Sequence, residues 1–177
     1  MSGICCRFAV SDCIDIGAGA GKYEKLVRQH YPKSRIIGIE IEEDYIAQFG
    51  LTSIYDEVKC VSAETLIDPS SEQSFDLVIF GDCLEHMRKS IGIDLVNYFI
   101  YRTKYMLALF PEGLIQGSWR GHSSEAHISV WSQNDFAVFD HIFFQRNRYD
   151  LVAVNGYLLK RVELTVQELL AEYIRTK

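Results

Sequence analysis

The stretch from Asp15 to Gly21, with the sequence DIGAGAG, constrains the fold of this chain more than any other segment. An acidic residue ends a short apolar run, glycines follow at every second position, and a run typical of a helix begins at Lys22. Glycines permit a tight turn, the approach of a ligand to the backbone, and close packing of a helix on a strand. The stretch therefore predicts a first strand that passes into a first helix in a nucleotide-binding α/β sheet.

Strands and helices are predicted to alternate along most of the chain. The β-branched run at 35–41 is typical of a strand buried on both faces, and further strands are expected at 11–16, 56–62, 75–80 and 113–118. Helices are expected at 20–31, 42–49, 91–110 and 132–140, the last one capped by Ser132 with Asp135. Such alternation indicates βαβ units, whose right-handed crossovers place a ligand at the carboxyl ends of the strands.

The end of the chain has a different pattern. Segments 149–154 and 157–163 flank Asn155-Gly156, which is a strong signal for a β-hairpin. Thr165 and Glu168 form a capping-box pattern and predict a final helix at about 165–176. We therefore expect one domain over residues 1–177, with a Rossmann-like, doubly wound, mostly parallel seven-stranded sheet and a C-terminal antiparallel hairpin.

Composition narrows the partners and the compartment. The formal net charge is −6 and the basic residues are scattered, so nucleic-acid and anionic-membrane partners are disfavoured. The five cysteines show no C-x-x-C pair, which indicates free thiols in a reducing compartment. Residues 1–10 do not have the pattern of a signal peptide, and no apolar run reaches the roughly 20 residues of a membrane span. A cytoplasmic protein is expected.

The spacing of the glycines favours one kind of nucleotide ligand. A dinucleotide-binding motif has the spacing Gly-x-Gly-x-x-Gly, whereas the third glycine here comes one residue earlier, in Gly17-x-Gly19-x-Gly21. Asp15 at the strand end would lie poorly beside a phosphate, and it suits a cationic amine. With these residues the sequence resembles the class I S-adenosylmethionine-dependent methyltransferases, whose first motif is acid-x-Gly-x-Gly-x-Gly.

The resemblance implies cofactor-binding roles for several further residues. Glu40 at the end of the second strand would accept both ribose hydroxyls, and Ile41 would pack on the adenine face. Ala63 and Glu64 would meet the adenine edge, and Asp82 would lie near the methionine moiety of S-adenosylmethionine. The implied cofactor set is Asp15, Gly17, Gly19, Gly21, Glu40, Ile41, Ala63, Glu64 and Asp82.

Residues after the fourth strand are candidates for the chemistry. Methyl transfer is an in-line displacement in which the protein positions the reactants and sometimes removes a proton. Glu85 and His86 follow the fourth strand, and His127 lies in the neighbouring loop 119–131. We expect Glu85, His86 and His127 to face the acceptor, which would be a small molecule or saccharide methylated on oxygen or nitrogen.

Two alternatives remain open. Asp82, Glu85, His86 and His127 together resemble the metal-binding set of the small-RNA 3′-end 2′-O-methyltransferases. Asp82 stands where that family has Glu, however, and the chain lacks the basic surface expected for RNA. The preferred interpretation therefore assigns no metal ligand. A non-catalytic cofactor-binding scaffold is the second alternative.

A further resemblance covers more of the chain. The segments GKY (21–23), GIEI (38–41), YDEV (55–58), GDCLEH (81–86) and EAHISVW (125–131) look like a poorly assigned bacterial and phage branch of the family, in which some members accompany glycan or small-metabolite modification.

Family members usually carry a helical segment before the glycine motif that roofs the acceptor pocket, and residues 1–14 are too short for it. The roof is expected from 119–131, from a partner chain in a homodimer, or from ordering on binding. We expect an open, shallow acceptor site.

Overall fold

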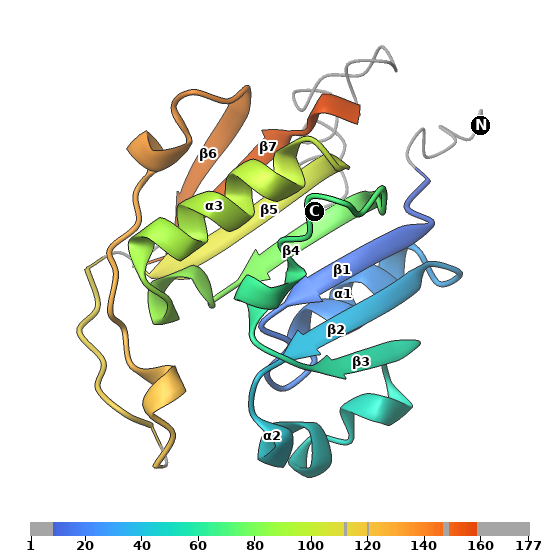
Figure 1. Ribbon diagram of the computed structural model, residues 1–177, viewed down its shortest axis with the longest axis vertical. Helices are drawn as coiled ribbons and strands as arrows, with labels where there is room; N and C mark the ends of the chain where they lie inside the picture. Colours follow the sequence, from blue (N-terminus) through green and yellow to red (C-terminus); the bar gives the residue numbers. More distant parts are fainter. Residues whose placement is uncertain (1–8, 112, 120, 147–148, 159–177) are drawn as a thin grey trace.

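The computed structural model describes residues 9–111, 113–119, 121–146 and 149–158 (Figure 1). Within these residues, seven strands form one sheet in the order β3-β2-β1-β4-β5-β7-β6. The strands are β1 (Asp12–Ile16), β2 (Arg35–Glu40), β3 (Glu57–Cys60), β4 (Phe75–Gly81), β5 (Thr103–Pro111), β6 (His141–Arg146) and β7 (Tyr149–Asn155). The helices are α1 (Lys22–His30), α2 (Glu43–Gln48) and α3 (Lys89–Ile100).

Strand directions divide the sheet into two parts. Strands β1 to β5 pair in parallel, whereas β7 runs antiparallel between β5 and β6. A mostly parallel, seven-stranded, Rossmann-like sheet with an antiparallel pair near the C-terminus was predicted from the sequence, and the structure confirms it. The strand order reverses between β1 and β4, which is where open α/β sheets bind their ligands.

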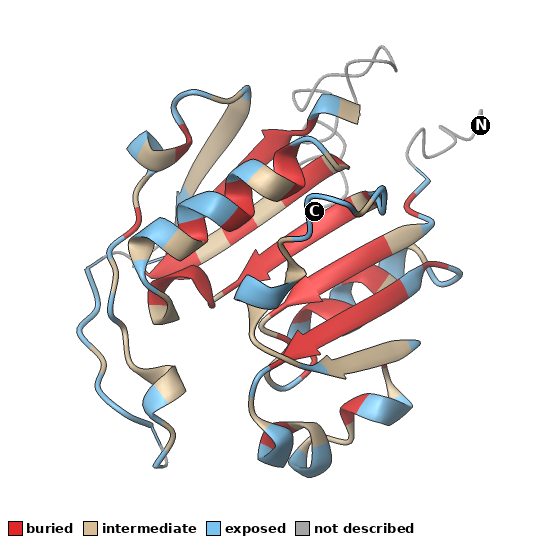
Figure 2. Cartoon of the chain, viewed as in Figure 1, coloured by how far each residue is buried: buried red, intermediate tan, exposed pale blue. Residues whose placement is uncertain are grey.

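Helices cover both faces of the sheet and bury its centre (Figures 1 and 2). On one face, Leu95 and Phe99 of α3 pack with Phe80 of β4. On the other face, Tyr23 and Val27 of α1 belong to the second core cluster. Burial on both faces explains the near-continuous apolar sequences of β2 and β4.

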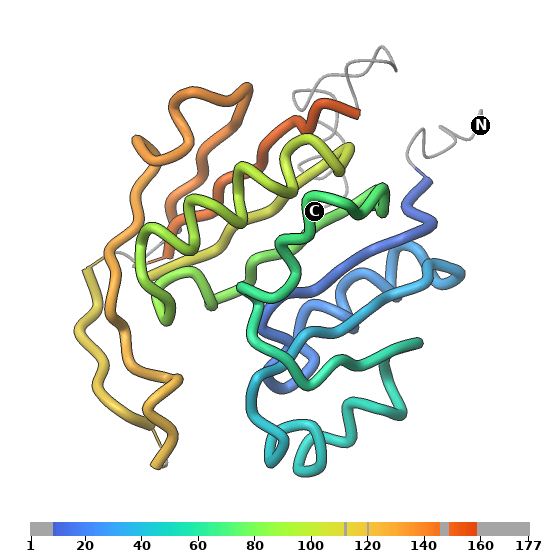
Figure 3. Tube along the Cα trace, viewed as in Figure 1, coloured from blue at the N-terminus to red at the C-terminus, as the bar shows by residue number. Residues whose placement is uncertain are grey.

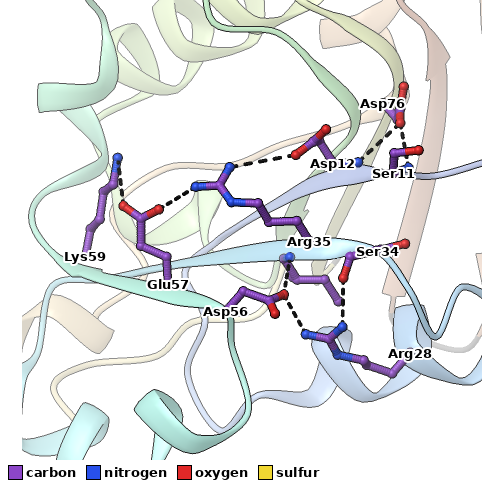
Figure 4. A network of polar contacts seen from close by, with 10 residues as sticks. Ser11, Asp12, Arg28, Ser34, Arg35, Asp56, Glu57, Lys59 and Asp76 are labelled. Atoms are coloured by element: carbon purple, nitrogen blue, oxygen red, sulfur yellow. Dashed lines mark hydrogen bonds and ion pairs between the residues drawn. The ribbon is translucent and has the colours of Figure 1, made fainter.

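The amino-terminal ends of the strands carry a network of ion pairs (Figure 4). Arg35 at the start of β2 contacts Glu57 of β3 at 2.6 Å and Asp12 of β1 at 3.7 Å. Arg28 of α1 pairs with Asp56 at 2.7 Å. These charges neutralise one another at the edge of the sheet opposite the carboxyl ends of the strands.

The fifth strand lies earlier in the chain than predicted. The expected helix at 91–110 ends at Ile100, and β5 occupies Thr103–Pro111 in place of 113–118. The reason is that a short apolar run cannot be assigned to helix or strand by periodicity alone. Tyr101 ends α3, and the ladder to β4 requires an extended chain from Thr103 onward.

The C-terminal half differs from the prediction in two further respects. The helix expected at 132–140 is a single 3-10 turn, η5 (Gln133–Phe136), although the predicted cap by Ser132 and Asp135 is present. Among the described residues the antiparallel hairpin is formed by β6 and β7. Residues 157–158, which follow Asn155-Gly156, are not in a strand, and the rest of the expected strand, 159–163, lies outside the described residues. Gly156 is needed for another reason, since a Cβ there would lie 1.9 Å from the carbonyl oxygen of Thr103. The predicted helix at 165–176 lies outside the described residues.

A long excursion without regular strands connects β5 to β6. Residues 113–119 and 121–131, which we call the arm, extend beside the carboxyl ends of the parallel strands (Figures 1 and 3). Its secondary structure is limited to the 3-10 turn η4 (Ser123–Glu125) and an isolated bridge between Trp119 and His122. Among the helices of the described part of the chain, none is long and apolar enough to cross a bilayer.

Candidate cofactor and acceptor site

The glycine turn between β1 and α1 forms one wall of the site. Gly17, Gly19 and Gly21 have positive φ angles of 81°, 50° and 71°, a conformation that other L-residues rarely adopt. A Cβ atom on Gly17 would lie 2.5 Å from the Cβ of Cys83, which follows β4. The glycine at position 17 is therefore needed both for the turn and for the close approach of the loop after β4.

Glu40, the last residue of β2, holds this turn from the neighbouring strand. Its Oε2 accepts a hydrogen bond from the backbone N–H of Gly19 at 2.8 Å, and its Oε1 accepts one from the backbone N–H of Glu42 at 3.0 Å. The residue is only 6% exposed, and a buried carboxylate requires such donors. A carboxylate has about four acceptor positions, so Glu40 retains capacity for the hydroxyl groups of a ligand.

The glycine turn and Glu40 open onto one large cavity at the carboxyl ends of the parallel strands. Its volume is about 670 Å³, within the usual range of small-molecule sites. One side is formed by the glycine turn and the ends of β2 and β3, and the other side by the loop after β4, the start of α3 and the arm. The predicted cofactor residues in its lining are Gly17, Gly19, Glu40, Ile41, Ala63 and Asp82.

Asp15 lies beneath the turn, outside the cavity lining. It is fully buried, and the hydroxyl of Tyr55 donates a hydrogen bond of 2.6 Å to its Oδ2. Its Oδ1 has no hydrogen-bond partner among the described residues. Burial is the main reason that the pKa of Asp15 is raised to about 7, and the nearby charges of Glu40 and Glu24 add to the effect. The structure thus gives Asp15 a place under the glycine turn that does not touch the cavity.

Gly21 and Glu64 also lie outside the lining. A Cβ on Gly21 would lie 2.3 Å from the Cδ1 of Ile54, so this glycine permits packing against the segment after α2. Glu64 is exposed on the 3-10 turn η2 (Ala63–Leu66), while the preceding Ser62 and Ala63 face the cavity. The polar side chain expected at the adenine edge is therefore not in the wall of this cavity.

Asp82, directly after β4, is held in an uncommon conformation at the cavity wall. Its φ of 53° is positive, which is unusual for a residue other than glycine. The hydroxyl of Tyr23 donates a hydrogen bond of 2.6 Å to its Oδ2, and the Nζ of Lys22 lies 3.3 Å from the same atom. Burial and the bond to Asp82 raise the pKa of Tyr23, so the phenol stays a donor. Two residues of α1 thus fix a carboxylate of the β4 loop.

The three residues expected to face the acceptor lie together. Glu85 and His86 belong to the 3-10 turn η3 (Leu84–His86), and His127 comes from the arm. The rings of His86 and His127 are 4.8 Å apart between centroids, at an angle of 74°. His86 lines the cavity, whereas Glu85 and His127 are not among its lining residues. The structure thus brings the three predicted residues close together, but only His86 lines the cavity.

Burial shifts the proton equilibria of two of these residues. Glu85 is 3% exposed, and burial raises the pKa of its carboxyl to about 8. Burial likewise lowers the pKa of His86, so a neutral imidazole is favoured at physiological pH. A neutral imidazole in a cavity wall can take a proton from the group that is to be methylated.

The arm is fastened across the site at Glu42, a contact that sequence reasoning missed. The Nδ1 of His122 lies 3.0 Å from Oε2 of Glu42, and Ser124 donates a hydrogen bond to its Oε1. These bonds lower the pKa of Glu42, the bond from Ser124 most strongly. Trp119 and Glu125 of the arm also line the cavity. A partner 80 residues away leaves no local pattern in the sequence.

The comparisons with known proteins agree with this geometry. Residues 14–100 match the family model described as a methyltransferase domain. No curated protein sequence matches the chain. Among solved structures, a SAM-dependent methyltransferase from Archaeoglobus fulgidus is 14% identical with a TM-score of 0.63, covering 83% of this chain and 86% of that one.

Two further structures show the same fold. The N-methyltransferase NodS from Bradyrhizobium japonicum WM9 is 13% identical with a TM-score of 0.58, covering 84% of this chain and 86% of that one. An O-methyltransferase family protein from Burkholderia thailandensis is 13% identical with a TM-score of 0.58, covering 83% of this chain. This chain spans only 51% of that relative.

The family match covers the strands and turns that build the cofactor half of the cavity, from β1 to α3. The sheet order and the antiparallel pair β7-β6 complete the same architecture in the remaining part of the described chain. The cofactor of such a domain is S-adenosylmethionine. Residues 14–100 thus match a methyltransferase domain, and the glycine turn and the fold are similar to those of the S-adenosylmethionine-dependent methyltransferases.

Proposed function

We propose that the protein transfers the methyl group of S-adenosylmethionine to an oxygen or nitrogen atom of a small-molecule or saccharide acceptor. The observation that carries this proposal is the single cavity that joins the glycine turn and Glu40 to His86 and the arm. A donor seated at the turn and an acceptor beside His86 would lie next to each other in one cavity, as an in-line displacement requires.

In this proposal, residues at the ends of different strands bind different parts of the cofactor. Glu40 accepts the ribose hydroxyls with the acceptor capacity that its bonds to Gly19 and Glu42 leave over. Ile41 and Ala63 line the adenine side, and Asp82 faces the methionine end. Asp15 acts indirectly, because it supports the turn from below.

The acceptor half would use His86 as the proton acceptor. Its Nδ1 lies 3.4 Å from the carbonyl oxygen of Ala126, which leaves Nε2 as the atom able to take a proton. Glu85 and His127 close to it would hold the ring in place. Met87 and Trp119 in the lining suit an acceptor with an apolar part. An N-methyltransferase and an O-methyltransferase family protein with this fold support either acceptor atom.

Several wider expectations also stay proposals. A cytoplasmic location is supported by the free thiols of Cys13, Cys60 and Cys83. The formal net charge of −6 supports an acceptor other than nucleic acid. The single domain over 1–177, the homodimer and the open, shallow acceptor site expected from the sequence are part of the same proposal. The arm, which lines the cavity, is the candidate roof.

The first experiment is calorimetry with S-adenosylmethionine, S-adenosylhomocysteine and NAD. Binding of both sulfur compounds and not of NAD is expected. Glu40→Ala should abolish most of this affinity, whereas Glu43→Ala, an exposed carboxylate three residues on, should leave it unchanged. Normal binding by Glu40→Ala would refute the ribose assignment.

The second experiment is a screen of small-molecule, saccharide and RNA acceptors with a labelled methyl donor. Transfer to a small molecule or saccharide is expected. Transfer to RNA 3′ ends alone would favour the RNA methyltransferase alternative. Cofactor binding without transfer to any acceptor would favour the scaffold alternative.

A further inference from the structure

The arm borders the cavity, yet its own packing is sparse. It contributes four residues to the cavity lining, namely Trp119, Ser124, Glu125 and Ile128. None of the described residues from 113 to 130 is buried, and Ile115 is 97% exposed. Segments with few buried apolar contacts open locally at a low cost in free energy. The position of the arm therefore depends on a small set of polar contacts.

The returning part of the arm is anchored to the turn η3. Trp131 is 3% exposed, and its Nε1 donates a hydrogen bond of 3.0 Å to the carbonyl oxygen of Leu84. The backbone carbonyl of Glu85 accepts the N–H groups of Ile128 at 2.8 Å and Ser129 at 3.1 Å. These contacts give the arm a fixed base beside the loop after β4.

The tip of the arm, residues 121–125, is fastened to the β2 side of the cavity by one carboxylate. The Nδ1 of His122 lies 3.0 Å from Oε2 of Glu42, and the hydroxyl of Ser124 donates a hydrogen bond to Oε1 of the same residue. The ring of Tyr45 packs edge-on against His122, with 4.8 Å between the ring centroids. We call Glu42, His122 and Ser124 the latch, because together they hold the tip against the start of α2.

The latch lies next to the carboxylate that we assign to the ribose. The backbone N–H of Glu42 donates a hydrogen bond of 3.0 Å to Oε1 of Glu40. Ile41 before Glu42 and Tyr45 after it line the cavity, whereas neither Glu42 nor His122 is among the lining residues. Glu42 is thus linked to the cofactor side by its backbone and to the arm by its side chain.

We propose that Glu42 is a positioning residue whose bonds to His122 and Ser124 gate the passage of S-adenosylmethionine and S-adenosylhomocysteine into and out of the cavity. With the latch closed, the arm stays in the cavity wall. When the latch opens, the tip moves away about its anchored base and widens the access to the cavity. Lid opening of this kind limits product release in many enzymes. The inference rests on the proposed function, because the gated ligand is the proposed cofactor.

The test measures the association and dissociation rates of S-adenosylhomocysteine by surface plasmon resonance with the full chain. A gate that the ligand must pass predicts that loss of the latch raises both rates together, whereas loss of a direct contact raises the dissociation rate alone. Glu42→Ala and His122→Phe should each raise both rates about tenfold, because a hydrogen bond to a charged group shifts an opening equilibrium by about that factor. The affinity should change less than either rate. His122→Phe keeps an aromatic ring beside Tyr45.

Glu43→Ala is the matched control, since Glu43 is an exposed carboxylate in the first turn of the same helix. It should leave both rates unchanged. In the double variant Glu42→Ala/His122→Phe, both rates should equal those of Glu42→Ala, because the partner of His122 is already absent. Additive effects of the two substitutions would contradict a shared latch.

Limited proteolysis without any ligand tests the latch apart from the cofactor. Cleavage within the arm should be faster in Glu42→Ala and His122→Phe than in the wild type and Glu43→Ala. If Glu42→Ala fails to fold, His122→Phe decides the matter, because His122 lies in the sparsely packed arm.

Three results would overturn the gate. They are unchanged cleavage of the arm in the latch variants, binding kinetics equal to those of the wild type, and a rise in the dissociation rate alone. A wild type that binds no S-adenosylhomocysteine would refute the proposed function, and the gate with it. Normal binding by the wild type with unchanged rates in the latch variants would refute the gate and leave the proposed function standing.

Discussion

Replacement of Gly17 by alanine tests how tightly the glycine turn and the loop after β4 are packed. Two effects are expected at this position. Gly17 has a φ of +81°, and a Cβ there would lie 2.5 Å from the Cβ of Cys83. The Cβ of Cys83 is attached directly to the backbone, so it cannot move away as the end of a flexible side chain could.

The size of the effect follows from these two terms. A side chain in the left-handed region costs about 1 to 2 kcal/mol, and overpacking in a well-packed interior costs about 1 to 3 kcal/mol. The free energy of unfolding should therefore fall by about 2 to 5 kcal/mol. For a chain of this size that corresponds to a decrease in Tm of roughly 4 to 20 °C.

Gly50→Ala is the matched control, because Gly50 has a φ of +61° and nothing within 4 Å of its Cβ position. It should show only the conformational term, about 1 to 2 kcal/mol. Urea denaturation of both variants and of the wild type measures the difference. Adding Cys83→Gly to Gly17→Ala should restore part of the loss, which a double-mutant cycle quantifies. Equal destabilisation by Gly17→Ala and Gly50→Ala would refute the packing argument.

Two further predictions concern buried polar contacts. Tyr23→Phe removes the hydroxyl that donates to Asp82 at 2.6 Å. Because a hydrogen bond to a charged group contributes about 1.5 to 3 kcal/mol, the affinity for S-adenosylhomocysteine measured by calorimetry should fall about tenfold or more. The exposed control variant Tyr101→Phe should bind S-adenosylhomocysteine normally. Asp15, whose pKa is raised to about 7 by burial, holds a proton in the folded state that the unfolded chain releases above about pH 4. The free energy of unfolding should therefore fall as pH rises from about 4 to 7, by up to about 1.4 kcal/mol per pH unit. Asp15→Asn should flatten this dependence in urea denaturation, and an unchanged slope would contradict the assignment.

Local patterns were enough to predict the part of the fold that binds the cofactor. The alternating glycines require a turn with positive φ, and that turn is found between β1 and α1. The β-branched run before Glu40 predicted a buried strand, and in a parallel sheet its carboxyl end must lie beside the end of β1. Gly17 and Glu40 could therefore be placed at one site from the sequence alone.

Patterns of similar strength were ambiguous where one segment suited two structures. The run that follows Tyr101 is apolar enough to extend a helix, yet it forms β5 because β4 offers an unpaired edge. The Asn155-Gly156 pair fits a hairpin turn, but here the glycine permits contact with Thr103. Tertiary pairing decided both cases, since neighbouring residues contain no information about which strand edge is free.

The sequence by itself determined the order of the elements from β1 to α3, the glycine turn and the acid that ends β2, because each depends on residues a few positions apart. Only the tertiary structure decided which side chains share the site. Tyr23 meets Asp82, His122 meets Glu42, and His127 meets Glu85 and His86 across long separations in the chain. Such contacts follow from how the arm and the loops pack at the carboxyl edge of the sheet, and no local periodicity encodes that packing.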